Sequence, residues 1–389
     1  MRPLDIVLEV GLNADAMRGI DYYIANVVNA LAGIDRVNRY AVFSYFFRDY
    51  RRKRARLPLP EGPNFEALVR RFPERWVRLV DRRWGLPLVQ SVLLGGRRPD
   101  VYHVVGGGSL PHLSGPKSVV TFFDLAEEAF PHDGSRPEPG RRIHAPATFD
   151  IARRADCLLA TGEYTKRDLM RYYGIPEGKI AVIPTGVNDQ VFRPVRDPAA
   201  LNRARERYRL PERYLMMIGP YQPPRRNNAD VVFQAFAEMR RSGAAGGCRL
   251  VLVGRGAEPL REAAARLGLA DAVQATGFVE LADLPAIYAL SSGVVHPTSV
   301  EGFGYGLEVL ACGAALITSD LPGVVEAVAD AALTVPPRAV EPLRQAMADL
   351  LGKPGLKEEL VRRGLERAAG FSYQRVAERI LGLYERLAR

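Results

Sequence analysis

The sequence predicts an α/β fold with two domains, each built on a parallel sheet. Short apolar runs typical of buried strands alternate with stretches of helical period along nearly the whole chain. This alternation is typical of parallel sheets covered by helices. The length of 389 residues suits two domains of ordinary size.

The first half opens with a strand, a glycine-containing loop and a helix. The strand is expected at 5–10 and the helix at 20–31, with an apolar stripe formed by Ile20, Tyr23, Ile24, Val27, Val28 and Leu31. A helix at 165–174 has Thr165 as its expected N-cap and Gly174 as its end. Further strands are expected at 40–47, 100–105, 118–124, 157–161 and 179–184, and a helix at 146–154.

The second half restarts the alternation after residues 195–212, which are polar, rich in charge and expected to form a linker. Strands are expected at 214–219, 249–254, 273–279, 293–296, 315–318 and 333–336, and helices at 229–240, 280–290, 307–312 and 340–351. A last amphipathic helix is expected at 371–387. The predicted organisation is therefore a domain at 1–194, a linker, a domain at 213–370 and a C-terminal helix within 371–389.

Composition excludes several classes of protein. No apolar run is long enough to span a bilayer, and the first residues lack the apolar core of a signal peptide. Three scattered cysteines give neither a disulfide framework nor a zinc site and favour a reduced cytoplasm. The dinucleotide pattern Gly-x-Gly-x-x-Gly does not follow the first strand, so a redox cofactor is not expected. The net charge of +10 suits an anionic partner.

Residues 48–98 form the most unusual segment. One basic cluster consists of Arg48, Arg51, Arg52, Lys53, Arg54 and Arg56. A second, from Arg70 to Arg83, is interleaved with apolar residues that begin at Phe65 and Leu68 and include Trp76 and Trp84. The second cluster predicts a basic amphipathic helix broken at Pro73. Either its apolar face packs on the domain core, or the helix docks on anionic lipid or holds a phosphorylated acceptor. Nucleic acid is not expected, because no recognition motif accompanies the charge.

The strongest functional signal is the stretch from Ser299 to Gly313, between a predicted strand and a predicted helix. Its glycines let a ligand lie against bare backbone N–H groups, and a helix start favours anions. Glu301 and Glu308 flank the loop, and carboxylates accept hydrogen bonds from sugar hydroxyls. Phosphate on the amides and hydroxyls on two carboxylates together describe a nucleotide-sugar. The alternative is a surface loop with ordinary acids at a helix start.

This stretch resembles the Glu-x7-Glu signature of retaining glycosyltransferases with the GT-B fold, glycosyltransferase family 4 in particular. Here six residues separate Glu301 from Glu308, and Gly306 stands near the place of a usual proline. The resemblance extends over nearly the whole chain. It implies two Rossmann-like, doubly wound domains facing across a cleft, with a C-terminal helix that crosses back to the first domain.

The resemblance also implies roles for individual residues of the second domain. Arg225 and Arg226 correspond to cations that hold the donor diphosphate, and arginine can grip a phosphate with two hydrogen bonds. Glu308 would hold the ribose hydroxyls, and Glu301 with the backbone of 302–304 would orient the sugar. The implied donor contacts are completed by Gly302, Phe303, Gly304, Gly219, Gly254 and Gly277.

In the first domain the resemblance is carried by fewer residues. Gly19 belongs to a loop near the donor phosphates, although Asp21 stands where the family has a second glycine. Asp124 matches the second member of a His-Asp pair, with Phe123 in place of the histidine. His103 matches a family histidine position, and a lone histidine at a strand end is also commonly structural.

These features together imply a retaining hexosyltransferase that moves a sugar from a nucleotide-diphosphate sugar to a hydroxyl acceptor. The family generally works without a metal, so none is expected, and the nucleotide-sugar is a substrate and not a cofactor. A cytoplasmic location is expected, with possible attachment to the inner face of the membrane through 48–98. Two rival hypotheses are a sugar-nucleotide-binding protein without transferase activity and a basic membrane-surface or nucleic-acid scaffold.

Overall fold

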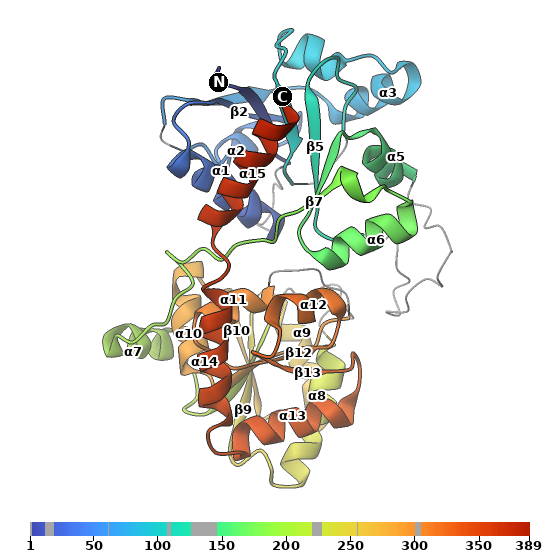
Figure 1. Ribbon diagram of the computed structural model, residues 1–389. Helices are drawn as coiled ribbons and strands as arrows, with labels where there is room; N and C mark the ends of the chain where they lie inside the picture. Colours follow the sequence, from blue (N-terminus) through green and yellow to red (C-terminus); the bar gives the residue numbers. More distant parts are fainter. Residues whose placement is uncertain are drawn as a thin grey trace. The chain divides into compact units, whose positions relative to one another are not determined.

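The structure is a computed structural model that describes residues 2–11, 19–60, 62–106, 110–125, 146–219, 228–254, 256–299 and 305–389. The described chain divides into two compact units (Figure 1). The first runs to Gly186 and takes up the chain again at Tyr373–Arg389, and the second is Val187–Ser372. The sequence places these divisions at 194 and 371. No helix in the described ranges is long and apolar enough to cross a membrane.

The first unit is a seven-stranded parallel sheet in the order β3-β2-β1-β4-β5-β6-β7. Its strands are β1 Asp5–Glu9, β2 Arg39–Tyr45, β3 Phe65–Arg70, β4 Val101–Val104, β5 Lys117–Phe122, β6 Cys157–Ala160 and β7 Ile180–Val182. Its helices are α1 Gly19–Ile34, α2 Tyr50–Arg54, α3 Glu74–Trp84, α5 Pro146–Arg154, α6 Glu163–Tyr173 and α15 Tyr373–Leu387. A π-helical turn, Val89–Leu93, and a 3₁₀ turn, Glu177–Lys179, complete it.

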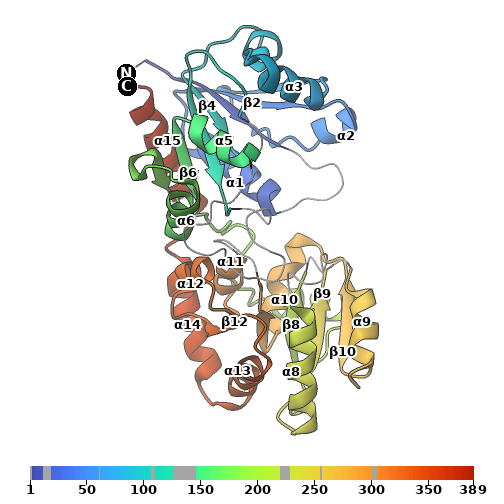
Figure 2. The same ribbon diagram turned by 90° about the vertical axis from the view of Figure 1, so that its right-hand side faces the viewer.

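Alternating side chains of this sheet enter two separate apolar cores. Val7, Tyr102 and Val120 face a core shared with α3, α5 and α6. Ile6, Leu8 and their neighbours face a core filled by α1 and α15. The two helices lie side by side in Figures 1 and 2, although more than 300 residues separate them in the chain. The C-terminal helix therefore returns to the first unit, as expected.

The second unit is a six-stranded parallel sheet in the order β10-β9-β8-β11-β12-β13. Its strands are β8 Tyr214–Ile218, β9 Arg249–Val253, β10 Val273–Gly277, β11 Gly293–His296, β12 Leu316–Ser319 and β13 Leu333–Val335. Its helices are α7 Pro198–Arg207, α8 Ala229–Arg241, α9 Glu258–Ala265, α10 Leu284–Leu290, α11 Tyr305–Ala311, α12 Pro322–Val328, α13 Val340–Gly352 and α14 Leu356–Ala368, with a 3₁₀ turn at Leu281–Asp283.

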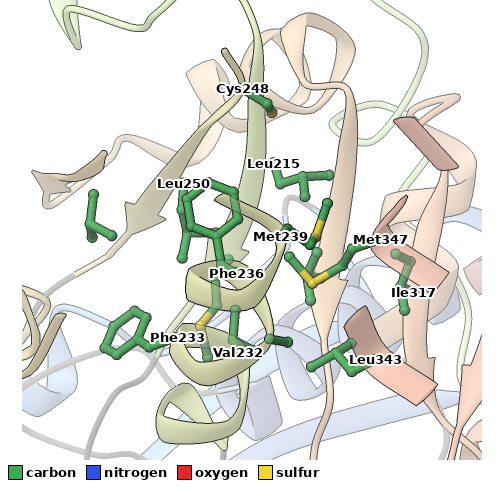
Figure 3. Close-up of a cluster of buried hydrophobic side chains, with 14 of the residues drawn as sticks. Leu215, Val232, Phe233, Phe236, Met239, Cys248, Leu250, Ile317, Leu343 and Met347 are labelled. Atoms are coloured by element: carbon green, nitrogen blue, oxygen red, sulfur yellow. The ribbon is translucent and has the colours of Figure 1, made fainter. Parts of the chain in front are cut away.

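Helices cover both faces of the second sheet. On one face α8 and α13 pack on β8, β9 and β12, and their side chains meet in the apolar cluster of Figure 3. Phe233 and Phe236 of α8 are almost wholly buried there, and fully burying such a ring stabilises the fold by about 2–3 kcal/mol. On the other face α7, α10, α11 and α12 enclose a second cluster. Both units are thus doubly wound α/β sheets, as the sequence predicts.

Three local predictions are wrong. Residues 65–70, expected to be helical, form strand β3, which pairs in parallel with β2, so that the helix begins only after Pro73. The expected linker at 195–212 contains α7, whose first turn is capped by the Asp197 carboxylate. Helix α6 begins at Glu163, and Thr165 is not its N-cap, because its hydroxyl donates to the Phe123 carbonyl.

The expected apolar stripe of α1 is correct except at its first residue. Tyr23, Ile24, Val27, Val28 and Leu31 are buried, whereas Ile20 is 38% exposed. Helix α6 ends at Gly174 in the left-handed conformation, as expected.

Candidate active site

The second sheet reverses its winding direction between β8 and β11. From β8 the chain proceeds through α8 to β9 on one side, and from β11 through α11 to β12 on the other side. The two connections leave the carboxyl ends of neighbouring strands in opposite directions, and open α/β sheets bind ligands at such a point. Residues 220–227 follow β8 and residues 300–304 follow β11, so both predicted donor-binding stretches belong to this position in the topology.

Asn228 joins the two connections. Its side chain is fully buried, and its amide donates to the Pro297 carbonyl at 2.8 Å. Its amide oxygen accepts from the Ser299 hydroxyl at 2.9 Å and from the Arg338 guanidinium at 3.2 Å. Asn228 directly follows 220–227, and Ser299 directly precedes 300–304. These hydrogen bonds therefore hold the residue that follows one stretch against the residues that precede the other.

Three predicted glycines line the same edge of the sheet. The Gly219 N–H donates to the Val253 carbonyl, and the Gly254 N–H donates to the Gly277 carbonyl, so the ends of β8, β9 and β10 are joined. Gly254 has a φ of 119° and Gly277 a φ of 69°. L-residues with a side chain rarely adopt these conformations, so glycine is required where both strands turn away from the sheet.

Glu308 lies in the first turn of α11, the next element after β11 along the chain. Glu308 is half-buried. The same helix approaches its neighbours closely at Gly306, where an added Cβ would lie 2.6 Å from a methyl of Val328 in α12. Glycine at 306 therefore serves close helix packing. Burial raises the pKa of the Cys312 thiol at the end of this helix to about 12, and the Glu308 carboxylate adds to the rise.

The other predicted donor-site residues lie outside the described residues. These are Arg225, Arg226, Glu301, Gly302, Phe303 and Gly304. The structure describes the residues on either side of them, and it brings those flanking residues together through Asn228. The roles of the six residues stay predictions.

In the first unit His103 and Asp124 have different surroundings. His103 is fully buried within β4, with Nδ1 hydrogen-bonded to the Tyr384 hydroxyl of α15 and Nε2 to the Thr121 hydroxyl of β5. Burial lowers the pKa of His103 to about 3, so its ring is neutral at physiological pH. This geometry favours the structural interpretation of the histidine. Asp124 is half-buried just beyond the carboxyl end of β5, and Gly19 is the exposed first residue of α1.

Sequence reasoning missed a polar pair at the carboxyl end of β1, formed by the half-buried Glu9 and the fully buried Tyr102. The Tyr102 hydroxyl of β4 donates to the Glu9 carboxylate at 2.5 Å. Burial, followed by repulsion from Glu74, raises the pKa of Glu9 to about 7. β1 and β4 are the neighbours between which the first sheet reverses its winding. The only sequence signal for Glu9 is that a charged residue ends an apolar strand. The only signal for Asn228 is its position directly before a predicted helix.

Metal ligands do not gather in the described ranges, where no three His, Cys, Asp or Glu side chains are grouped closely enough to hold an ion.

Comparison with known families agrees with this architecture. Residues 17–191 match the family model described as Glycosyltransferase Family 4, and residues 212–353 match the one described as Glycosyl transferases group 1. The chain belongs to the glycosyltransferases. The first model covers the first sheet except β1, the second covers all six strands of the second sheet, and the two together span most of this glycosyltransferase.

A curated relative of this glycosyltransferase is the D-inositol 3-phosphate glycosyltransferase of Acidothermus cellulolyticus. It is 32% identical over 320 residues, which are 79% of this chain and 63% of that relative. The chain therefore spans less than two thirds of the length of this curated relative.

Solved structures share the fold from end to end. The sucrose-phosphate synthase of Thermosynechococcus elongatus has a TM-score of 0.67 at 21% identity and covers 100% of this chain and 99% of its own. Alr3699/HepE of Anabaena, in complex with UDP-glucose, has a TM-score of 0.69 at 15% identity and covers 98% of this chain and 99% of its own. The glycosyltransferase described here thus has the GT-B architecture of two Rossmann-like domains.

Proposed function

We propose that this glycosyltransferase moves a sugar from a nucleotide-diphosphate sugar to a hydroxyl group of an acceptor, with retention of the anomeric configuration and without a metal. The observation that carries the proposal is the Asn228 junction, which holds the flanks of both predicted donor-binding stretches together where the second sheet reverses its winding. The complex of Alr3699/HepE with UDP-glucose, in a chain of the same fold, supports a nucleotide-sugar donor.

The predicted residues divide the donor between them. Arg225 and Arg226 meet the charge that develops on the leaving diphosphate, which is the main electrostatic demand of the reaction when no metal is present. Glu308 accepts hydrogen bonds from the ribose hydroxyls, while Glu301 and the backbone of 302–304 orient the sugar ring. The leaving phosphate takes the acceptor proton on the same face of the sugar. Protein groups then act mainly by positioning and by electrostatic stabilisation.

The first unit would bind the acceptor. The resemblance assigns Gly19 to a loop near the donor phosphates and makes Asp124 a candidate catalytic residue. The acceptor classes that fit are a glycolipid, a polysaccharide or a small molecule carrying a hydroxyl group. The protein would work in the cytoplasm, attached peripherally to the inner face of the membrane when its acceptor is a lipid.

The first test is donor binding. Thermal unfolding is recorded with UDP-, GDP-, ADP- and dTDP-sugars, with the free sugar and the nucleoside as controls. A ligand that binds only the folded protein stabilises it by about 2.7 kcal/mol at a hundredfold excess over its Kd. One family of donors should raise the melting temperature well above the controls. A flat panel across all four bases would contradict the proposal.

The second test is the role of Glu308. Glu308→Gln should raise the donor KM and lower kcat/KM, because hydrogen bonds from the ribose to a charged acceptor weaken. The fall in kcat/KM should correspond to about 1–3 kcal/mol of lost transition-state stabilisation. Glu358 is a matched control, since it is an exposed acid in the first turn of α14. Glu358→Gln should leave donor kinetics unchanged. Equal kinetics of Glu308→Gln and the wild type would remove Glu308 from the site.

The runner-up is a nucleotide-sugar-binding protein without transferase activity. The six-residue spacing between Glu301 and Glu308 and the phenylalanine at 123 favour it. Both hypotheses predict donor binding, so the binding panel does not separate them. Release of free nucleotide in the presence of mixed hydroxyl acceptors does, because only a transferase turns the donor over.

A further inference from the structure

The positive charge of the chain is concentrated in one segment of the first unit. Residues 48–98 contain fourteen Lys and Arg and five Asp and Glu, so this segment holds nine of the ten net positive charges. The remaining 338 residues are therefore nearly neutral. Such a distribution is not a uniform effect of arginine-rich composition, and it gives the segment a local attraction for anionic surfaces.

Exposed apolar side chains gather in the same segment. The described chain has thirteen exposed large hydrophobic residues, and six of them lie in this segment: Leu59, Trp76, Leu79, Trp84, Leu86 and Val92. A seventh, Phe47, directly precedes it. Single exposed apolar residues are ordinary, whereas a group of them marks an interaction site. Charge and apolar surface therefore coincide in a part of the fold that holds none of the predicted donor residues.

Helix α3 orders these side chains on its solvent face. Val77 is buried in the core of the first unit and fixes which side of the helix faces the sheet. Residues 75, 76, 79 and 83 lie three to four positions apart on the opposite side, and all four are exposed. This face combines two arginines with Trp76 and Leu79, which are 48% and 47% exposed. At the end of the helix Trp84 is 60% exposed.

The arginines of this face are available for an external partner. Arg75 and Arg83 have no ion-pair partner within the described ranges, in contrast to Arg97 of the same segment, which pairs with Asp5 and Glu66. Beside the helix, Arg71 stacks over the exposed ring of Phe47 at 5.1 Å, so a cation and an aromatic ring again present themselves together. Figure 2 shows α3 as an outer helix of the first unit.

We propose that α3 and its flanking residues 71, 85 and 86 form a docking surface for an anionic lipid bilayer. Arginines would bind lipid phosphates while Trp76, Leu79 and Trp84 enter the boundary between headgroups and acyl chains, where tryptophan is favoured. The helix would lie in the plane of the surface. The inference specifies the peripheral location proposed above, and it does not depend on the transfer reaction.

Lipid fits this surface better than the other anionic partners. A nucleic acid would be held by the arginines, but it would leave the aliphatic Leu79 and Leu86 exposed to water. A second copy of the chain would bring two strongly basic segments together and would place like charges against each other. Only a bilayer offers negative charge and an apolar interior at the depth of one helix.

The chain carries its own reporter for the test. Trp76 and Trp84 are its only tryptophans, and both are exposed on α3. Intrinsic tryptophan fluorescence of the full chain therefore reports on this helix alone. Vesicles of phosphatidylcholine with phosphatidylglycerol should shift the emission to the blue, and lipids with brominated chains should quench it. Vesicles of phosphatidylcholine alone should do neither, and added salt should reverse the shift.

Charge-matched variants give the second measurement. Arg75→Glu with Arg83→Glu should weaken flotation with the anionic vesicles about tenfold or more, since each basic residue near such a surface contributes separately. The control pair is Arg261→Glu with Arg266→Glu, at two exposed arginines in and beside α9 with the same change in net charge. Leu79→Ala with Leu86→Ala should also weaken binding and keeps both tryptophans, whereas the exposed Leu267→Ala should not.

Circular dichroism and thermal unfolding of each variant check that the chain as a whole remains folded. The proposal is overturned if the emission does not shift with anionic vesicles, or if the control pair on α9 reduces binding as much as the pair on α3. It is also overturned if duplex DNA gives the shift at lower concentration than lipid, or if the shift occurs without vesicles as the chain dimerises. Donor binding should be the same in these variants as in the wild type. Loss of vesicle binding therefore tests the docking surface, and loss of donor binding tests the proposed function.

Discussion

Glu9 makes the stability of the first unit depend on pH. Its carboxyl group keeps its proton up to about pH 7 in the folded chain, against an ordinary pKa of 4.5, mainly because burial disfavours the charge. Between these two values the folded state binds more protons than the unfolded state, so the free energy of unfolding falls as pH rises. The stabilisation is complete below pH 4.5 and is lost as the pH passes 7.

We therefore expect Glu9→Gln to be more stable than the wild type at pH 8 and nearly equal to it at pH 5. The gain at pH 8 should approach about 3 kcal/mol, since glutamine keeps an acceptor for Tyr102 without a buried charge. Denaturant unfolding at the two pH values measures it. The exposed Glu212→Gln serves as control and should show no such difference. An identical pH slope in Glu9→Gln and the wild type would contradict the assignment.

His103 acts in the opposite direction. Its pKa is lowered by burial from 6.5 to about 3, so below pH 6.5 the unfolded state binds the extra proton and the native state loses stability. His103→Gln should remove this acid-side slope. It should also cost about 1–3 kcal/mol at pH 7, because the hydroxyls of Tyr384 and Thr121 lose well-placed partners. Unfolding curves between pH 4 and pH 7 test both effects, and an unchanged stability with lost turnover would favour the catalytic interpretation instead.

Asn228 shows what single-residue reasoning from the sequence could not reach. An asparagine before a helix suggests a cap, yet its side chain makes no capping bond and instead spans to Pro297 and Ser299, about seventy residues away. Such a contact depends on which strands are neighbours, and no local pattern encodes strand order. The acids and arginines predicted for the site rest instead on family motifs, which a sequence does carry.

A pair of substitutions separates the two roles of Asn228. Its φ of 47° is left-handed, which glycine adopts freely and alanine does not. Asn228→Gly loses only the amide and should destabilise the second unit by about 2 kcal/mol, since its three partners are left without it. Asn228→Ala should cost about 1 kcal/mol more. Thermal unfolding gives both numbers, and donor affinity should fall in both variants if the junction positions the binding stretches. Unchanged donor affinity in the destabilised variants would disconnect the junction from the site.

At the scale of elements, buried strands and long amphipathic helices were predictable from the sequence, whereas an edge strand and an exposed helix were not. Buried strands such as β8 and β11 are unbroken apolar runs, so their positions follow from the sequence. β3 was mistaken for helix because it is an edge strand that exposes Glu66 and Arg70, and its apolar run, 67–69, is only three residues long. α7 was mistaken for a linker because only Ala204 of its length is buried. In both cases tertiary pairing supplies what local pattern lacks.

Two alanines at helix ends should respond in opposite directions to the same substitution. Ala329 ends α12 with φ 50° and ψ −126°, a conformation that belongs to glycine. Ala369 ends α14 in ordinary helical geometry. Both are exposed, so packing changes little. Ala329→Gly should raise the free energy of unfolding by about 1 kcal/mol through relief of strain. Ala369→Gly should lower it by about 0.5–1 kcal/mol through chain entropy. Unfolding midpoints that move in the same direction would contradict the backbone assignment.

At the scale of the whole molecule, the two units differ in how the chain supplies them. The second unit is continuous, Val187–Ser372, and contains both of its apolar clusters. The first unit depends on α15, because Val376, Ile380 and Tyr384 fill the core that α1 lines, and residues 2–186 lack this helix. We therefore expect the second unit to fold as an isolated fragment and the first unit to need residues 373–389 in order to fold.

A fragment of residues 187–372 should fold alone and unfold cooperatively, whereas residues 2–186 should aggregate or bind hydrophobic dyes through the uncovered face of α1. Circular dichroism and dye binding compare them. A third fragment tests the cause, since the two chain ends lie close together within the first unit in both Figures 1 and 2. Residues 373–389 joined by a flexible linker to residues 2–186 should restore folding.

Donor binding gives a further test of the second unit. Because the Asn228 junction and the strand-end glycines all belong to 187–372, the fragment 187–372 should keep the donor-dependent rise in melting temperature. A folded fragment without that rise would place the donor contacts outside the second unit and would remove the Asn228 junction as the support for the proposed function.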